Sequence, residues 1–278
     1  SKLAVTQRRK SVIQDRLAVL KKENGMIEKL IGAGEVEFSS RQVASQRMND
    51  AIREFQNVTE AELEQQMELV KLMGMHPSSA PRLRFLTGQG FSLPAAVAAP
   101  SPAALMESPK VKAQMATYAT TETLLKTEIR RQYPELELGP SFTRDDEEKE
   151  VGGEIGFNIP LWNRNRKAIA EARGVRNTAR LETVQLWKTE LFNARQLEAT
   201  QQMVIRHCRT ELQRMESFSS SVQTMEKLHG IGEASLLELA ENRHQLYESR
   251  LAFLDSLDKL LGIQAQLRYI THANLQSK

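Results

Sequence analysis

The sequence is poor in the residues on which many protein classes depend. Its 278 residues include one cysteine, which excludes an internal disulfide framework and a cysteine-based zinc site. With 14 glycines and 9 prolines, it is neither collagen-like nor of low complexity. The formal net charge of +3 is too small to indicate nucleic-acid binding. The sequence has no apolar run long enough to predict a transmembrane helix.

Sequence motifs of catalysis are also missing. We find no phosphate-binding loop, no nucleophile motif and no pair of catalytic carboxylates. None of the five histidines has a second histidine at the spacing of metal ligands. We therefore expect no enzymatic activity, no cofactor and no metal site.

Abundant Leu, Ala, Glu, Gln and Arg indicate long helices, and aromatic residues make up only 5% of the chain. Within the longest expected helix, apolar residues recur mostly at spacings of three, four and seven, which is typical of a coiled coil. A proline-rich segment at 76–106 interrupts the helical pattern and is interpreted as an irregular linker. The sequence predicts a mainly helical fold, with helices over 1–31, 36–73, 107–133, 163–228 and 235–272.

One segment has the period of a β-strand. Over 151–161, an apolar row alternates with small or polar residues; the row includes Val151, Ile155, Phe157 and Ile159. Residues 136–142 alternate in the same way, and the polar stretch TRDDEEKE at 143–150 is interpreted as a solvated loop rather than a cation site. The sequence therefore predicts one β-hairpin at 135–161. Its apolar row suits a lipid-facing strand with Trp162 at the aqueous boundary, and the alternative is a soluble hairpin that caps a helical bundle.

Two glycine turns belong to an internal repeat. IEKLIGAGE at 27–35 and MEKLHGIGE at 225–233 share six of nine residues at an offset of 198. Gly32 and Gly34 correspond to Gly230 and Gly232, and each pair ends a helix. The long helix would span roughly 100 Å, which two shorter helices placed end to end would match. We expect both turns at one end of this rod, with the hairpin at the other.

A hairpin on such a rod resembles the TolC family of outer-membrane channel proteins. The motifs that carry the resemblance are YPELELG at 133–139, VGGEIGFNIPLWNRNR at 151–166 and HGIGEASLLELAENRHQLYESRLAFL at 229–254. PLWNRNR is the most specific and is similar to heavy-metal and drug efflux members. The resemblance extends over about 25–278. It implies an α-barrel subunit of antiparallel coiled-coil helices, whose β-hairpin contributes to an outer-membrane β-barrel.

The resemblance also implies a division of the chain into repeats. Residues 1–75 would be the helical hairpin of a first repeat, 76–106 an equatorial linker, and 107–278 the second repeat with its turn at 229–234. By the repeat offset, about ninety residues of the first repeat are expected before Ser1. The first repeat is therefore interpreted as truncated at its N-terminus.

The function that the resemblance implies is an exit duct for a tripartite efflux or type I secretion system. The chain would form a homotrimer, contact outer-membrane lipid, and lie mostly in the periplasm of a Gram-negative type envelope. Its partners would be a periplasmic adaptor and an inner-membrane pump, with no nucleic acid. The alternative class is a soluble coiled-coil scaffold or a periplasmic adaptor, although we find no lipoyl-like β-domain.

The resemblance assigns roles to two sets of residues. Gly32, Gly34, Gly230 and Gly232 would form the tips that dock the adaptor, while the alternative is ordinary turn chemistry. Glu238 and Glu241 lie three residues apart on one helical face and would form an acidic ring at the tunnel mouth. The alternative for these two carboxylates is a solvated outer face.

Overall fold

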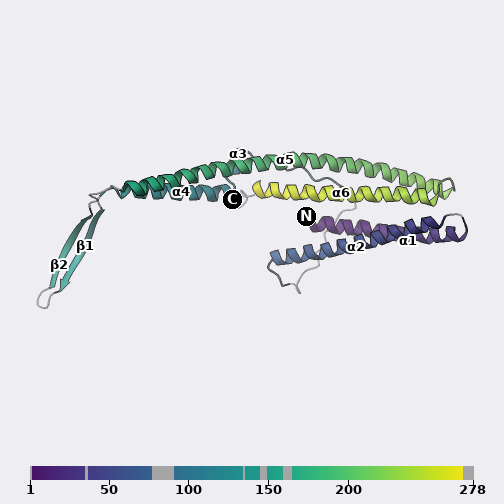
Figure 1. The fold of residues 1–278 in the computed structure, drawn as a ribbon, viewed down its shortest axis with the longest axis horizontal. Coiled ribbons are helices and arrows are strands. Elements are labelled where there is room, and N and C mark those ends of the chain that lie inside the picture. The colour runs from purple at the N-terminus through teal and green to yellow at the C-terminus, as the bar shows by residue number, and fades with distance from the viewer. Residues whose placement is uncertain are drawn as a thin grey trace. The chain divides into compact units, whose positions relative to one another are not determined.

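The computed structural model describes residues 2–34, 37–76, 91–133, 135–144, 149–158 and 165–271 (Figure 1). The chain forms two compact units, one with Ser1–Ala98 and Leu197–Arg268, the other with Ala99–Gln196 and Tyr269–Lys278. In chain order the elements are α1 (Lys2–Gly32), α2 (Phe38–Leu72), α3 (Pro102–Met106), α4 (Pro109–Arg130), β1 (Glu135–Arg144), β2 (Lys149–Asn158), α5 (Arg166–Gly230) and α6 (Leu236–Thr271).

The helices of the first unit bury a strict heptad repeat. In α6 every seventh residue from Leu239 to Leu267 is at most 9% exposed. The same step of seven occurs among buried residues of the other helices. The buried series are Ile13, Leu20 and Ile27 in α1; Ala44, Ala51 and Val58 in α2; Gln201, Cys208, Met215 and Val222 in α5; and Leu239, Leu246, Phe253, Leu260 and Leu267 in α6. This repeat places an apolar seam along each helix, as in coiled coils.

The seams meet in one hydrophobic cluster, which joins Ile13 of α1, Val58 of α2, Cys208 of α5 and Phe253 of α6. Ile13, Cys208 and Phe253 are completely buried. Burial also raises the pKa of the Cys208 thiol above its ordinary value, which disfavours the reactive thiolate. Cys208 is therefore a packing residue.

The extended segment 91–98 is fastened to the first unit by two buried glutamines. Gln201 of α5 accepts a hydrogen bond from the Val97 N–H at 2.9 Å and donates one to the Val97 carbonyl at 2.7 Å. Gln264 of α6 donates to the Ala95 carbonyl at 2.9 Å. Each glutamine is only 1% exposed, so these bonds replace water at backbone groups that packing has covered.

In the second unit, the expected helix at 107–133 is present as α4, and a short helix that was not predicted precedes it. The structure forms the short helix α3 inside the expected linker and begins α4 at Pro109. The side chains of Ser101 and Ser108 each accept a bond from a backbone N–H three residues later, at Ala104 and Val111. A serine N-cap followed by proline is a strong helix start, so α3 begins inside the expected linker and α4 begins two residues later than predicted.

The expected β-hairpin is present in the second unit, and both strands extend further toward the loop than predicted. β1 and β2 pair antiparallel, and the register extends to Thr143↔Glu150 and Arg144↔Lys149. The expected polar loop at 143–150 is therefore wrong at both ends, because its outer residues belong to the strands. Residues 145–148 of the expected loop lie outside the described residues. Ile159 and Trp162 also lie outside them.

The two long helices of the expected second repeat differ from the prediction by a few residues. The first begins at Arg166 rather than 163, because Asn165 has a φ of 55°. It continues to Gly230, and the return helix begins at Leu236. A mainly helical chain of coiled-coil helices with one β-hairpin is confirmed. No described helix is both long and apolar enough to cross a membrane.

Candidate functional site at the helical turns

The α1–α2 and α5–α6 turns share one backbone conformation. Gly34 has a φ of 77° and Gly232 a φ of 80°. The Gly34 N–H donates to the Ile31 carbonyl at 3.0 Å, and the Gly232 N–H donates to the His229 carbonyl at 3.1 Å. These bonds occupy corresponding positions of the sequence repeat. Only glycine adopts this left-handed conformation readily, so the repeated glycine fixes both turns.

The two turns lie together in the first unit. A groove of about 540 Å³ is lined from both sides, by Glu37 and Ser40 of the first turn and by Gly232 and Ala234 of the second. Beneath it, Ile27 of α1 packs in one cluster with Ala44 of α2 and Leu236 of α6. The two turns therefore lie together, as the repeat predicted.

The carboxylate of Glu238 closes a capping box at the start of α6. It accepts hydrogen bonds from the Ser235 N–H at 2.9 Å and the Ser235 hydroxyl at 3.0 Å, while the Ser235 hydroxyl oxygen accepts from the Glu238 N–H. This reciprocal pattern satisfies two backbone donors at the helix N-terminus. The backbone bond, followed by the hydroxyl bond, lowers the pKa of Glu238.

Glu241 is paired with helix α2. The Arg47 guanidinium donates to one carboxylate oxygen at 2.5 Å, and Gln245 donates to the other at 2.9 Å. The hydrogen bond from Gln245 and then that from Arg47 lower the pKa of Glu241. Glu238 and Glu241 are both exposed and ionised, and each also has a structural partner within the chain.

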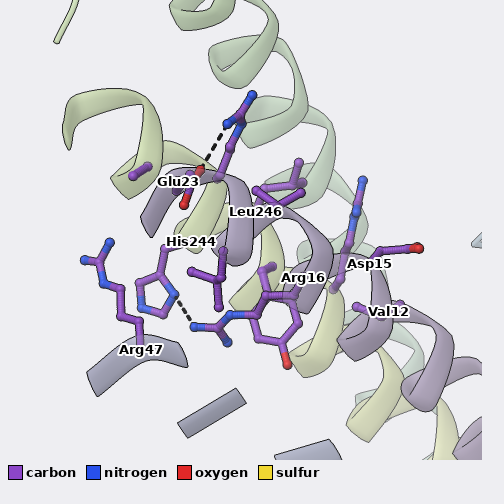
Figure 2. Close-up of a pocket in the computed structure, with 13 residues that line it drawn as sticks. Val12, Asp15, Arg16, Glu23, Arg47, His244 and Leu246 are labelled. Carbon is purple, nitrogen blue, oxygen red and sulfur yellow. Dashed lines mark hydrogen bonds and ion pairs between the residues drawn. The ribbon is translucent and has the colours of Figure 1, made fainter. Parts of the chain in front are cut away.

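A charged cavity of about 180 Å³ lies between α1, α2 and α6 (Figure 2). Arg16 of α1 lies 3.8 Å from the centre of the Tyr247 ring and donates to His244 at 3.1 Å and Glu248 at 3.4 Å. The Tyr247 hydroxyl donates to Glu54 of α2 at 2.6 Å. Burial, followed by this hydrogen bond, raises the pKa of Tyr247, so the phenol stays protonated.

A buried carboxylate forms the upper wall of this cavity in Figure 2. Glu23 is 5% exposed and pairs at 3.0 Å with Arg243, which also bonds Glu226 of α5 at 2.8 Å. This cluster was not predicted from the sequence, because its partners on α1 or α2 and on α6 are 193 to 232 residues apart in the chain. A signal was nevertheless present, since Arg9, Arg16 and Glu23 lie seven residues apart and hence on one face of α1.

The β-hairpin has one apolar face by its register. Leu136 pairs with Phe157, Leu138 with Ile155, and Phe142 with Val151. Directly opposite residues of an antiparallel pair share a face of the sheet. The side chains of Leu138 and Ile155 are 70% and 60% exposed. The sequence analysis assigned Ile155, Phe157 and Val151 to this face, and the register adds their partners on β1.

No group of three His, Cys, Asp or Glu residues within the described ranges is placed to hold a metal ion. In the same ranges, the groups that the structure brings together are the two turns, the capping box and the charged cavity.

Comparison with known proteins finds similar structures but no similar sequence. No protein-family model and no curated protein matches the chain. The outer membrane protein VceC from Vibrio cholerae matches with a TM-score of 0.79 and 15% identity, over 98% of this chain and 66% of VceC. The CmeC outer membrane channel from Campylobacter jejuni matches with a TM-score of 0.79 and 13% identity, over 98% and 60%. The outer-membrane channel OprN matches with a TM-score of 0.78 and 14% identity, over 99% and 64%.

These matches extend over almost every residue of the chain, while the chain spans less than two thirds of each structure. They therefore include the helices, both turns and the hairpin together. The chain has the fold of TolC-family outer-membrane channel proteins.

Proposed function

We propose that the chain is the channel-forming part of an outer-membrane exit duct for a tripartite efflux or type I secretion system. The observation that carries this proposal is the structural likeness to outer-membrane channels over 98% of the chain. The duct is not an enzyme, and an inner-membrane pump supplies the energy. Most of the chain lies in the periplasm, and the apolar face of the hairpin, which includes Leu138 and Ile155, contacts lipid.

Fractionation and conductance of the full-length protein test this function. We expect the protein in the outer membrane, soluble only in detergent, and we expect discrete conductance steps after reconstitution into planar bilayers. Replacing Leu138 and Ile155 by Asp should reduce membrane insertion, whereas replacing exposed Met106 by Asp should not. A soluble protein without conductance would contradict the duct and favour the coiled-coil scaffold.

We propose that three copies assemble through their helices. Large apolar side chains remain exposed on long helices in both units: Leu63 is 60% and Leu72 78% exposed on α2, and Leu181 is 69% and Phe192 68% exposed on α5. Exposed apolar surface of this kind is typical of protein interfaces. Mass measurement in detergent is expected to give a trimer, and a stable monomer that conducts would contradict this proposal.

We propose that the two turns dock a periplasmic adaptor. Among the described residues of the turns, Phe38 in the first and Ile231 in the second each present a large apolar side chain that is 70% exposed. Replacing Phe38 and Ile231 by Ser should reduce co-purification with the adaptor without unfolding the protein, because exposed side chains contribute little burial. The matched control is Met106→Ser, an exposed apolar residue of the second unit. Unchanged co-purification would contradict docking by these side chains.

We propose that Glu238 and Glu241 form an acidic ring that favours cations at the channel mouth. Both carboxylates are exposed, and their lowered pKa values keep them ionised at neutral pH. In a trimer they would gather several negative charges around one opening, which concentrates cations. The double variant Glu238→Gln/Glu241→Gln should lose cation preference and block by divalent cations. Unchanged selectivity would favour a solvated outer face and leave the duct itself intact.

A further inference from the structure

The hydrogen bond between α1 and His244 requires a neutral imidazole. Nη2 of Arg16 lies 3.1 Å from Nδ1 of His244. Arginine has only donors, so Nδ1 must accept and cannot carry a proton. The proton of the neutral ring then lies on Nε2. A second proton on the ring would remove the acceptor and place two cations in contact.

Positive groups from two other helices face this imidazole. Arg16 approaches from α1 and Arg47 from α2, and Figure 2 shows the His244 ring between their side chains. On α6 itself, the Glu248 carboxylate lies 3.7 Å from Nδ1, and Glu241 precedes His244 by three residues. The other ionisable residues lining the same cavity are Asp15, Glu23, Arg243, Tyr247 and Arg250.

The balance of these groups disfavours the charged ring. Burial, Arg16 and Arg47 lower the pKa of His244, and Glu248 and Glu241 offset only part of that effect. Because the pKa of His244 is lower in the folded chain, a ring that has left the Arg16 contact binds the proton more tightly than a ring that makes the contact. The contact is therefore fully stable above the ordinary value of 6.5. It weakens as the pH falls below that value, until the folded-state pKa is passed.

We propose that His244 is an acid-sensitive latch, whose protonation breaks the hydrogen bond between Arg16 of α1 and His244 of α6 and loosens the packing of the two helices at that point. The Arg16 side chain retains Glu248 and the Tyr247 ring as partners, so the loss is confined to one contact. On either side of it, Arg9 pairs with Asp255 and Glu23 pairs with Arg243. Opening is therefore local, between these two ion pairs. The latch does not depend on the proposed transport function.

Hydrogen exchange of the full-length protein tests the latch directly. We compare amide exchange at about pH 7.5 and about pH 5.5, corrected for the intrinsic pH dependence of exchange. One pKa unit corresponds to about tenfold in an equilibrium constant, so we expect exchange around Arg16 to rise about threefold to tenfold in acid. His244→Gln, whose amide oxygen can accept from Arg16 but cannot titrate in this range, should abolish the rise.

The matched control is His207→Gln, because His207 is exposed on α5 in the same unit. That variant should keep the acid response of the wild type. A wild type without an acid response, or a response that survives in His244→Gln, would overturn the latch.

A second measurement covers the case in which His244→Gln fails to fold. NMR of the histidine ring carbons in the wild type should place the titration midpoint of His244 below the ordinary histidine range. Arg16→Gln keeps a donor to Nδ1 but removes the cation, so the midpoint should rise. A wild-type midpoint at or above the ordinary range would overturn the proposal without any variant.

Discussion

The α1–α2 turn and the α5–α6 turn have the same backbone but different side-chain support. Gly34 and Gly232 make the same hydrogen bond, yet only α6 begins with a capping box, whereas Glu37 at the start of α2 makes no capping bond. The corresponding residues Phe38 and Leu236 are 70% and 5% exposed. Glycine thus determines the path of the chain, and the residues after it determine how firmly each turn is held.

The largest expected effect comes from the glycines, where the two turns should behave alike. Gly34→Ala or Gly232→Ala places a Cβ at positive φ, which costs about 1–2 kcal/mol for an L-residue. The controls are Gly32→Ala and Gly230→Ala, which lie at helix ends and whose added Cβ meets nothing within 4 Å. Those controls should be neutral or stabilising by up to about 1 kcal/mol. Urea denaturation measures the difference, and equal stabilities at all four sites would contradict the argument.

The caps should separate the two turns. Ser235→Ala removes the capping hydroxyl and should destabilise the first unit by about 1 kcal/mol. Glu37→Ser installs a capping hydroxyl at the corresponding position of α2 and should stabilise by about 0.5–1 kcal/mol. Ser39→Ala, two residues after that position, is the control. If Glu37→Ser destabilises the protein, the missing cap is not what makes the first turn less stable.

A smaller effect is expected from the ion pair that links α2 to the second turn. Arg47 and Glu241 are 27% and 49% exposed, so solvent screens their attraction. A double-mutant cycle with Arg47→Met and Glu241→Gln should give a coupling free energy below about 1 kcal/mol, and less at high salt. A coupling that salt leaves unchanged would mean that the pair is buried in the assembled protein.

The smallest expected effect is an acid response of the second turn alone. The pKa of Glu238 is lowered from 4.5 by the Ser235 bonds, so its contribution is complete above that value and is lost as the pH falls through the folded-state pKa. Amide exchange near Ser235 should therefore quicken in this acid range. Glu238→Gln should flatten the response. The first turn has Ser40 at the corresponding position and should show no such step; an equal response in both turns would refute the assignment.

Local patterns in the sequence predicted most of the fold. The glycine repeat predicted both turns, and the period-two pattern at 151–161 predicted the hairpin, because each signal lies within a few residues. Helix α3 was missed because, at five residues, it is too short to show a helical period. The serine–proline pairs at 101–102 and 108–109 were the available signal.

The candidate site was only partly predictable. The sequence placed Glu238 and Glu241 on one face but could not show that Ser235 and Arg47 bind them. The contact of Arg16 with His244 depends on how far α1 and α6 are shifted along each other. Heptad patterns give the face of each helix and not the relative position of two helices along their common axis.

The ion pairs along α1 determine its position relative to α6 along their common axis. The seam of α6 repeats every seven residues, so sliding α1 by one heptad would leave the apolar packing nearly unchanged. The charges are not periodic: Arg9 and Arg16 face Asp255 and Glu248, but Glu23 faces Arg243. A slip in one direction brings Glu23 to Glu248, and a slip in the other brings Arg16 to Arg243. One inverted pair therefore places two like charges together in a slip of one heptad in either direction, and this repulsion favours the observed register over shifted ones that the hydrophobic residues would accept.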